Sequence, residues 1–133
     1  MERFLNNEEL GNEDAAWLIV DRDRWAETEL RSLHEWAQID GRYGLAVSNP
    51  MFDYWLLLHV EDGAGIGSPR KCTARLRFHL LDYDKNLQPR TLREEVQNAV
   101  LRAERRDSPP CTDWPKDTGT TVYRLVRDLI GTE

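Results

Sequence analysis

Two short apolar runs, with a helical pattern between them, stand out in the first half of the chain. Residues 15–20 form an unbroken apolar run that stops at Asp21, and residues 44–47 form a second run. Over residues 25–39, apolar side chains recur at roughly helical spacing. Apolar runs as short as the first are typical of strands that are buried on both faces of a parallel sheet. The pattern therefore predicts a strand–helix–strand unit with parallel strands.

The rest of the chain has helical spacing and few strand signals. The predicted helices cover about residues 50–59, 68–81, 91–106 and 118–130. Residues 1–14 are polar and acidic without a sustained period and are expected to form a tail, which leaves residues 15–133 as a single domain. We expect an α/β fold, a Rossmann-like parallel sheet with flanking helices and a helical C-terminal half.

Two strands are too few for a stable parallel sheet, which needs about four. Either further strands escape the pattern, or an N-terminal part is absent, or another subunit completes the sheet. An unpaired apolar edge invites a second strand, and the closed form of such pairing is a two-fold dimer. We expect a homodimer whose sheet continues across the interface, or an edge that residues 1–14 cover.

Composition narrows the class of protein. The chain has 133 residues, a net charge of -6 and 40% hydrophobic residues, which fits one globular domain. No apolar stretch is long enough to span a bilayer, and the N-terminus does not resemble a signal peptide, so we expect a cytoplasmic protein without membrane association. Cys72 and Cys111 are far apart and in no metal-binding spacing, which favours ordinary intracellular thiols.

The charges are unevenly distributed. Residues 1–62 carry a net charge of -9, whereas residues 63–133 carry +3. This asymmetry suits a protein that binds a cation in one place and a polyanion in another, although two solvated faces would give the same pattern.

The pair Asp21 and Asp23 follows the first predicted strand directly. Ligand sites in open α/β sheets gather at the carboxyl ends of the strands, and two carboxylates there can bind one Mg²⁺. Two alternatives remain. Asp21 can simply end the strand while Asp23 caps the next helix, or Asp21 can be the nucleophile of a phosphotransferase, although the small hydroxyl residue typical of that class is missing from the following Arg24-Trp25.

A second polar segment follows the other predicted strand, and its loop should lie at the same edge. Asp53 would be a third acidic group there, and Ser48 and Asn49 could either bind a phosphate or cap the helix. His59 lies on the apolar stripe of that helix, as a buried structural histidine or a proton carrier. With three histidines in the chain no zinc constellation can be assembled, and no P-loop motif is present.

The chain resembles the RloB-like family, bacterial proteins with a Toprim-type catalytic core that are associated with restriction-modification loci and defence against phage. The resemblance covers about residues 15–130 and rests on the strand that leads into Asp21-x-Asp23, the block Ser-Asn-Pro-Met-Phe-Asp-Tyr-Trp-Leu-Leu-Leu-His of residues 48–59, Tyr83-Asp84-Lys85, and residues 120–126.

The resemblance implies a Toprim-like fold and a Mg²⁺- or Mn²⁺-dependent site that cleaves phosphodiester bonds in DNA or RNA. Asp21 and Asp23 match the metal-binding pair of the family, and Asp53 joins them as a candidate catalytic residue. The basic segments after residue 68 would follow the nucleic-acid backbone. The candidate phosphate-binding residues are Ser48, Asn49, Lys85, Arg102, Arg105 and Arg106. A role in abortive infection and a partner protein from the same locus are also implied.

The chain departs from the family pattern at two places. Family members usually begin with a further strand that carries a glutamate, the proposed general acid or base, and no such strand precedes Trp17. Members usually have Glu where this chain has Asp53. We expect an N-terminally shortened member, which is either a nuclease or a non-catalytic binding or regulatory subunit.

Overall fold

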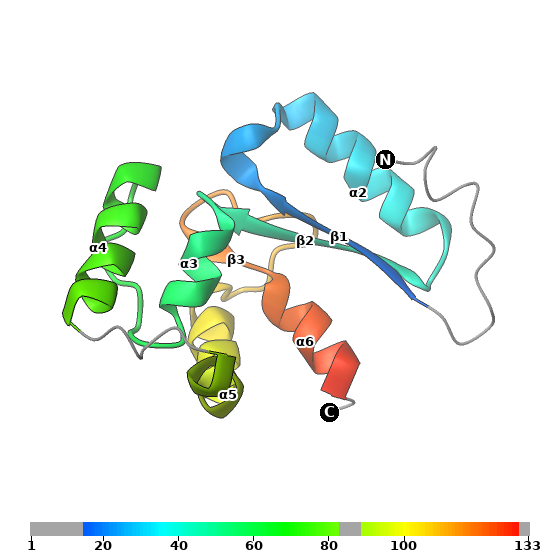
Figure 1. The fold of residues 1–133 in the computed structure, drawn as a ribbon. Coiled ribbons are helices and arrows are strands. Elements are labelled where there is room, and N and C mark those ends of the chain that lie inside the picture. The colour runs from blue at the N-terminus through cyan, green and yellow to red at the C-terminus, as the bar shows by residue number, and fades with distance from the viewer. Residues whose placement is uncertain (1–14, 83–88, 131–133) are drawn as a thin grey trace.

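The computed structural model describes residues 15–82 and 89–130 and confirms an α/β fold. Along the chain the elements are β1 (Ala16–Asp21), the 3-10 helix η1 (Arg22–Arg24), α2 (Glu27–Ile39), β2 (Tyr43–Asn49), α3 (Phe52–Leu57), α4 (Pro69–Asp82), α5 (Pro89–Arg106), β3 (Gly119–Thr120) and α6 (Val122–Ile130). The three strands form one sheet in the order β1-β2-β3, with α2 on one face and α3, α5 and α6 on the other (Figure 1).

The predicted strand–helix–strand unit is confirmed. Strands β1 and β2 are parallel, from Ala16 opposite Tyr43 to Asp21 opposite Ser48. The connecting helix begins at Glu27, a little later than the predicted start, because the 3-10 turn of η1 follows β1 first. The arrangement is consistent with a Rossmann-like fold.

The face of the sheet under α2 holds one of two apolar clusters. Ala16, Leu18 and Val20 alternate along β1 and point into it, where they meet buried side chains of α2 and Trp114. The other side chains of β1 are less covered, and Ile19 is 48% exposed. The expectation that this strand is buried on both faces is therefore wrong, since the strand follows the period-two burial of a sheet edge.

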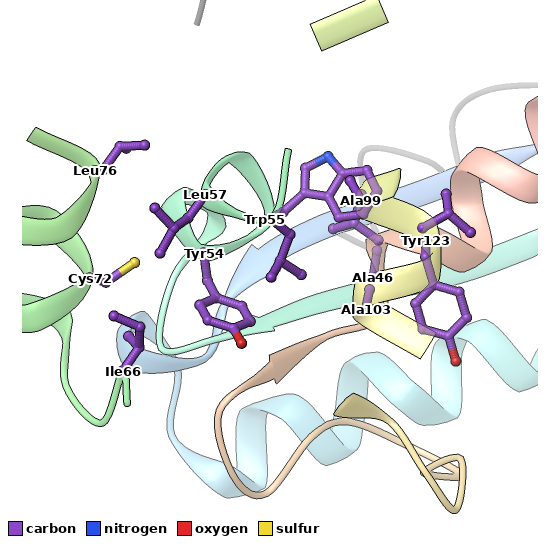
Figure 2. Close-up of a cluster of buried hydrophobic side chains, with 13 residues drawn as sticks. Ala46, Tyr54, Trp55, Leu57, Ile66, Cys72, Leu76, Ala99, Ala103 and Tyr123 are labelled. Atoms are coloured by element: carbon purple, nitrogen blue, oxygen red, sulfur yellow. The ribbon is translucent and has the colours of Figure 1, made fainter. Parts of the chain in front are cut away.

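The second apolar cluster lies on the opposite face and joins four helices. In Figure 2, Tyr54, Trp55 and Leu57 of α3 lie between Cys72 and Leu76 of α4 and small residues of α5. Ala99 and Ala103 are the small residues, and Tyr123 of α6 completes the cluster. Burial raises the pKa of Cys72 to about 12, so the thiol stays protonated, as expected of a structural cysteine.

A third strand escaped the sequence pattern. The two residues of β3 pair antiparallel with the end of β2, Thr120 opposite Ser48 and Gly119 opposite Asn49. The sequence pattern places this segment in the last helix, which begins at Val122 instead. Both residues are buried, but two residues are too few to show the period of a strand.

Other expectations concern the ends of elements or segments beyond the described ranges. Helix α3 ends at Leu57, before the predicted residue 59. The expected tail of residues 1–14 and the turn that contains Lys85 lie outside the described residues. None of the helices in the described part of the chain is long and apolar enough to cross a membrane.

Gly44 provides a direct test of the packing between β1 and β2. A Cβ atom at this position would lie 2.5–2.7 Å from the indole ring of Trp17. We expect Gly44→Ala to lower the free energy of unfolding by about 1–3 kcal/mol, the usual cost of overpacking. Urea denaturation measures it. Gly41→Ala is the matched control, because no atom lies within 4 Å of the added methyl group. Equal free energies of unfolding for Gly44→Ala and Gly41→Ala would contradict the close packing of Trp17 on Gly44.

Candidate active site

The carboxyl ends of β1 and β2 bring two loops together. Asp21 is opposite Ser48 in the parallel register, so the chain leaves both strands at the same edge of the sheet. The backbone N–H of Asp23 donates a hydrogen bond of 3.1 Å to the carbonyl of Pro50. The loop after β1 is thereby tied to the loop that leads into α3.

Asp21 holds the start of α3 from outside the helix. Its Oδ1 accepts a hydrogen bond of 2.8 Å from the backbone N–H of Phe52, the first residue of α3. The N-cap residue of α3, Met51, provides no side-chain cap. Because the first N–H groups of a helix lack partners within it, Asp21 supplies the acceptor that Met51 cannot. Its Oδ2 lies 3.9 Å from Nε of the exposed Arg24.

Asp53 is electrostatically coupled to Asp21. Burial raises the pKa of Asp53, and the negative charge of Asp21 raises it further. The charge of Asp21 acts on Asp53 even though the Arg24 side chain lies 3.9 Å from the Asp21 carboxylate. Asp23, the other residue of the Asp-x-Asp pair, lies in η1 and is exposed. The sequence pattern pairs Asp21 with Asp23, whereas the electrostatics of the structure couple Asp21 to Asp53.

This donor set fits a loosely held divalent cation better than an all-protein cage. Mg²⁺ usually takes one or two protein carboxylates and completes its shell with water and phosphate oxygens. Asp21 and Asp53 supply two, and a cation would relieve their repulsion. Within residues 15–82 and 89–130, no group of three His, Cys, Asp or Glu side chains is placed to hold a metal ion.

Ser48 and Asn49 make tertiary contacts at this edge. Ser48 is fully buried, and its hydroxyl shares a hydrogen bond of 2.7 Å with that of Thr120. The Asn49 amide donates to the carbonyl of Pro115 at 3.0 Å. Through these hydrogen bonds both side chains hold β2 against the segment around β3. Neither side chain caps α3.

His59 lies in the core, after the end of α3. Its Nδ1 is 3.0 Å from the carbonyl of Trp55, and its ring packs edge-on against the indole of the same residue. Burial lowers the pKa of His59, so the neutral ring is favoured, with Nδ1–H as the donor to Trp55.

Three candidate phosphate-binding arginines come together at the C-terminal end of α5. Arg102, Arg105 and Arg106 line a cavity of about 500 Å³ together with Asp62, Asp117 and Thr118, which we call the arginine groove. Arg102 donates to the carbonyl of Leu58 at 2.7 Å, and Arg106 donates to that of Asp62 at 3.2 Å. These bonds fix two guanidinium groups against the loop after α3.

The arginine groove leads toward the edge of the sheet. A neighbouring cavity of about 240 Å³ shares Arg106, Asp117 and Thr118 with it and extends to Thr120 in β3. Thr120 in turn contacts Ser48, the residue opposite Asp21. Buried contacts therefore join the wall of the smaller cavity to the strand that pairs with the end of β1.

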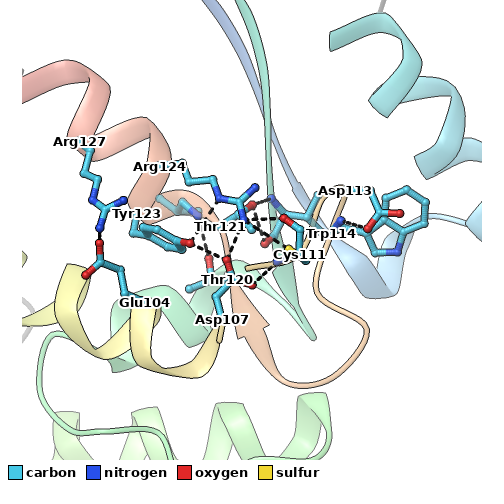
Figure 3. Close-up of polar contacts among 12 residues, drawn as sticks. Glu104, Asp107, Cys111, Asp113, Trp114, Thr120, Thr121, Tyr123, Arg124 and Arg127 are labelled. Carbon is cyan, nitrogen blue, oxygen red and sulfur yellow. Dashed lines mark hydrogen bonds and ion pairs between the residues drawn. The ribbon is translucent and has the colours of Figure 1, made fainter. Parts of the chain in front are cut away.

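A buried polar network holds the end of α5 against α6 (Figure 3). Asp107 accepts hydrogen bonds from the Tyr123 hydroxyl at 2.5 Å and from Arg124 at 2.8 Å. Arg124 also donates to the carbonyl of Cys111 at 2.8 Å. Burial alone would raise the pKa of Asp107, but the hydrogen bonds from Tyr123 and Cys111 and the charge of Arg124 together hold it below its ordinary value.

Sequence reasoning missed this network and the hydroxyl contact of Thr120. The residues are far apart along the chain, and no spacing rule joins Asp107 to Tyr123. The one available indication was the segment of residues 120–126, which formed part of the family resemblance.

The chain matches a known protein family. A family model described as "RloB-like protein" matches residues 1–129 of the 133-residue chain, which confirms the resemblance found in the sequence. No curated protein and no solved structure matches the chain.

Tyr123→Phe tests the polar network. We expect the variant to lose about 1–3 kcal/mol of stability at neutral pH, because it leaves a buried carboxylate with one donor fewer. Asp107 has a lowered pKa, so its contribution is present above the ordinary value of 3.8 and is lost as the pH falls through the lower pKa of the folded state. The free energies of unfolding of the wild type and the variant should therefore differ most at neutral pH and become similar in acid.

Urea denaturation at several pH values measures the difference. Tyr43→Phe is the matched control, because this half-buried ring stacks on Trp36 and takes no part in the network. A difference between wild type and Tyr123→Phe that stays constant with pH would contradict the role of Asp107.

Proposed function

Because this chain belongs to the RloB-like family, we propose that it cleaves phosphodiester bonds in nucleic acid with the help of Mg²⁺ or Mn²⁺. The observation that carries the proposal is the position of Asp21 and Asp53 where two parallel strands end, with Asp21 bonded to the first residue of α3 and Asp53 next to that residue. Ligand sites of open α/β sheets concentrate at this edge.

The residues that would hold the cation are Asp21 and Asp53, with the exposed Asp23 beside them. When bound, the cation supplies neutralisation of charge on the scissile phosphate and orientation of water. Asp21 contributes geometry as well as charge, because its bond to Phe52 fixes where its second oxygen and Asp53 lie. The proposed role of Asp21 in holding the cation thus depends on its hydrogen bond with Phe52, which also stabilises the start of α3.

The arginine groove is the proposed path of the nucleic-acid backbone. Arginine side chains bind phosphate in a fork geometry, and the two anchored guanidinium groups, Arg102 and Arg106, are held in place before any ligand arrives. The smaller cavity shares Arg106, Asp117 and Thr118 with the groove and would extend such a path as far as β3.

Membership of this family also supports a broader proposal. We propose a cytoplasmic role in phage defence by abortive infection, with a partner protein encoded at the same locus. The second candidate is a non-catalytic member that binds nucleic acid or protein. The observation that favours it is Asp53, where members of the family usually have Glu, whose side chain is one methylene longer.

A cleavage assay with Asp21→Asn tests the first candidate. Asparagine keeps an oxygen that can accept the Phe52 N–H, so the start of α3 is preserved while the charge is removed. We expect the wild type to cleave at least one member of a panel of DNA and RNA substrates with Mg²⁺ or Mn²⁺. Asp21→Asn and Asp53→Asn should each reduce the rate by about 10²-fold or more, the scale of losing metal-based charge stabilisation.

Glu27→Gln, on the exposed start of α2, is the matched control for a lost carboxylate. A thermal-shift series with Mn²⁺ provides a second readout and should separate the wild type from Asp21→Asn. Binding without metal-dependent cleavage across the whole panel would contradict the nuclease and support the non-catalytic member.

The salt dependence of binding tests the arginine groove. Replacing Arg102, Arg105 and Arg106 with alanine should weaken binding and reduce the log–log salt slope by about 0.7–0.9 for each phosphate that the variant no longer binds. Asp117→Asn, in the same groove, should have the opposite effect and strengthen binding, since it removes a negative charge. Fluorescence anisotropy between low and moderate salt measures both. Arg31→Ala on α2 controls for the loss of one positive charge, and a loss in that variant as large as in the triple variant would contradict the assignment.

We propose that two copies pair through the outer edge of β1. The strand order leaves this edge without a strand partner among the described residues, and Ile19 on β1 is 48% exposed. Light scattering at tens of micromolar should give twice the chain mass of 15.6 kDa, and Ile19→Lys should give a monomer. A monomeric wild type would contradict the pairing.

A further inference from the structure

A third cavity lies on the other side of the loop that borders the arginine groove. It has a volume of about 570 Å³ and lies between the loop after α3 and the exposed face of α4; we call it the α4 pocket. Lys71, Arg75 and Phe78 line it from α4, at spacings that place them on one face of the helix. Cys72 and Leu76, on the neighbouring face of α4, are buried in the core.

The charged wall of the α4 pocket is held by side-chain contacts. Glu61 accepts a hydrogen bond of 2.5 Å from Arg75 and lies 2.8 Å from Nε2 of His79. All three side chains line the pocket, so the loop is fixed to α4 by charge-assisted contacts.

The loop is also fixed from the core side. The hydroxyl of Tyr54 donates to the carbonyl of Gly63, whose φ of +74° is one that residues with side chains rarely adopt. Thr118 donates to the carbonyl of Ile66, which lines the pocket and is buried. The α4 pocket is therefore formed before any ligand binds, as ligand sites usually are.

The lining combines an exposed aromatic ring with cations. Phe78 is 59% exposed, an unusual position for a large apolar ring, and it lines the pocket beside Ala74 and Ile66. Lys71 is exposed, and Arg75 is partly exposed. A flat ring for stacking next to positive charge is the arrangement by which proteins bind unpaired nucleotides.

We propose that the α4 pocket binds an unpaired base of a single-stranded stretch of nucleic acid, which stacks on Phe78 while Lys71 contacts the adjoining phosphate. Glu61 lines this pocket and the next residue, Asp62, lines the arginine groove, so the two hollows are separated by one loop. A strand whose phosphates lie in the groove reaches the pocket by crossing that loop. The inference rests on the proposed nucleic-acid function and specifies its substrate as single-stranded or looped.

The proposal is tested by combining a variant that lacks the Phe78 ring with an oligonucleotide that lacks bases. Fluorescence anisotropy, with the full chain and no added divalent metal, compares a single-stranded oligonucleotide with one of equal length that carries abasic positions at its centre. Phe78→Ala should weaken binding of the intact strand by about tenfold, within the range for stacking of one base. The variant should bind the abasic strand as tightly as the wild type does. Phe78→Trp should keep the preference for the intact strand.

Leu101→Ala is the matched control, since Leu101 is a large apolar side chain, 53% exposed, on α5. Unchanged binding of the intact strand by Phe78→Ala, or an equal loss for both strands, would overturn the inference. If Phe78→Ala binds the intact strand as the wild type does, the alternative occupant of the α4 pocket is an apolar segment of a protein partner. The two proposals fail separately. If the preference for the intact strand depends on Phe78 but no substrate is cleaved, only the proposed nuclease activity is refuted. If the protein cleaves nucleic acid and Phe78→Ala changes neither cleavage nor binding, only the proposed base site is refuted.

Discussion

The parallel pairing of β1 with β2 is the constraint on which the candidate site depends. Its register places Asp21 opposite Ser48, so the loops that follow both strands leave from one edge of the sheet. Asp21 can then reach the first N–H of α3, and Asp53 lies in the next position of that helix. A shift of one residue would turn Asp21 to the other face of the sheet and remove both relations.

The same carboxylate thus serves the fold and the proposed chemistry. Asp21 replaces the N-cap that Met51 cannot provide, and it raises the pKa of Asp53. A negative charge beside the first N–H groups of a helix is favourable, whereas two carboxylates facing one region repel each other. Arg24, whose side chain is largely exposed, lies 3.9 Å from Asp21, and a cation at this edge would offset the charge of both carboxylates.

The C-terminal half connects a basic surface to that edge through contacts that are remote in sequence. The network of Asp107, Tyr123 and Arg124 joins the end of α5 to α6, while the hydroxyl of Thr120 joins β3 to Ser48. The arginines at the end of α5 keep a defined position relative to the sheet because these contacts are buried. Proteins rarely leave buried polar groups without partners, so such networks tend to fix one arrangement.

The sequence by itself determined the α/β class, the parallel pair of strands, the helices around them and the family, because these depend on local periodicity, on capping and turn residues and on one long motif. It also placed Asp21, Asp53 and Ser48 at one edge, since that follows from strand direction alone. Only the tertiary structure decided that Asp21 is coupled to Asp53, that β3 pairs with β2, and that Ile19 stays half exposed. It alone showed that Lys71 and Phe78 line one cavity together with the loop after α3. Each of these depends on which surfaces pack together across long separations in the chain, and periodicity carries no information about that choice.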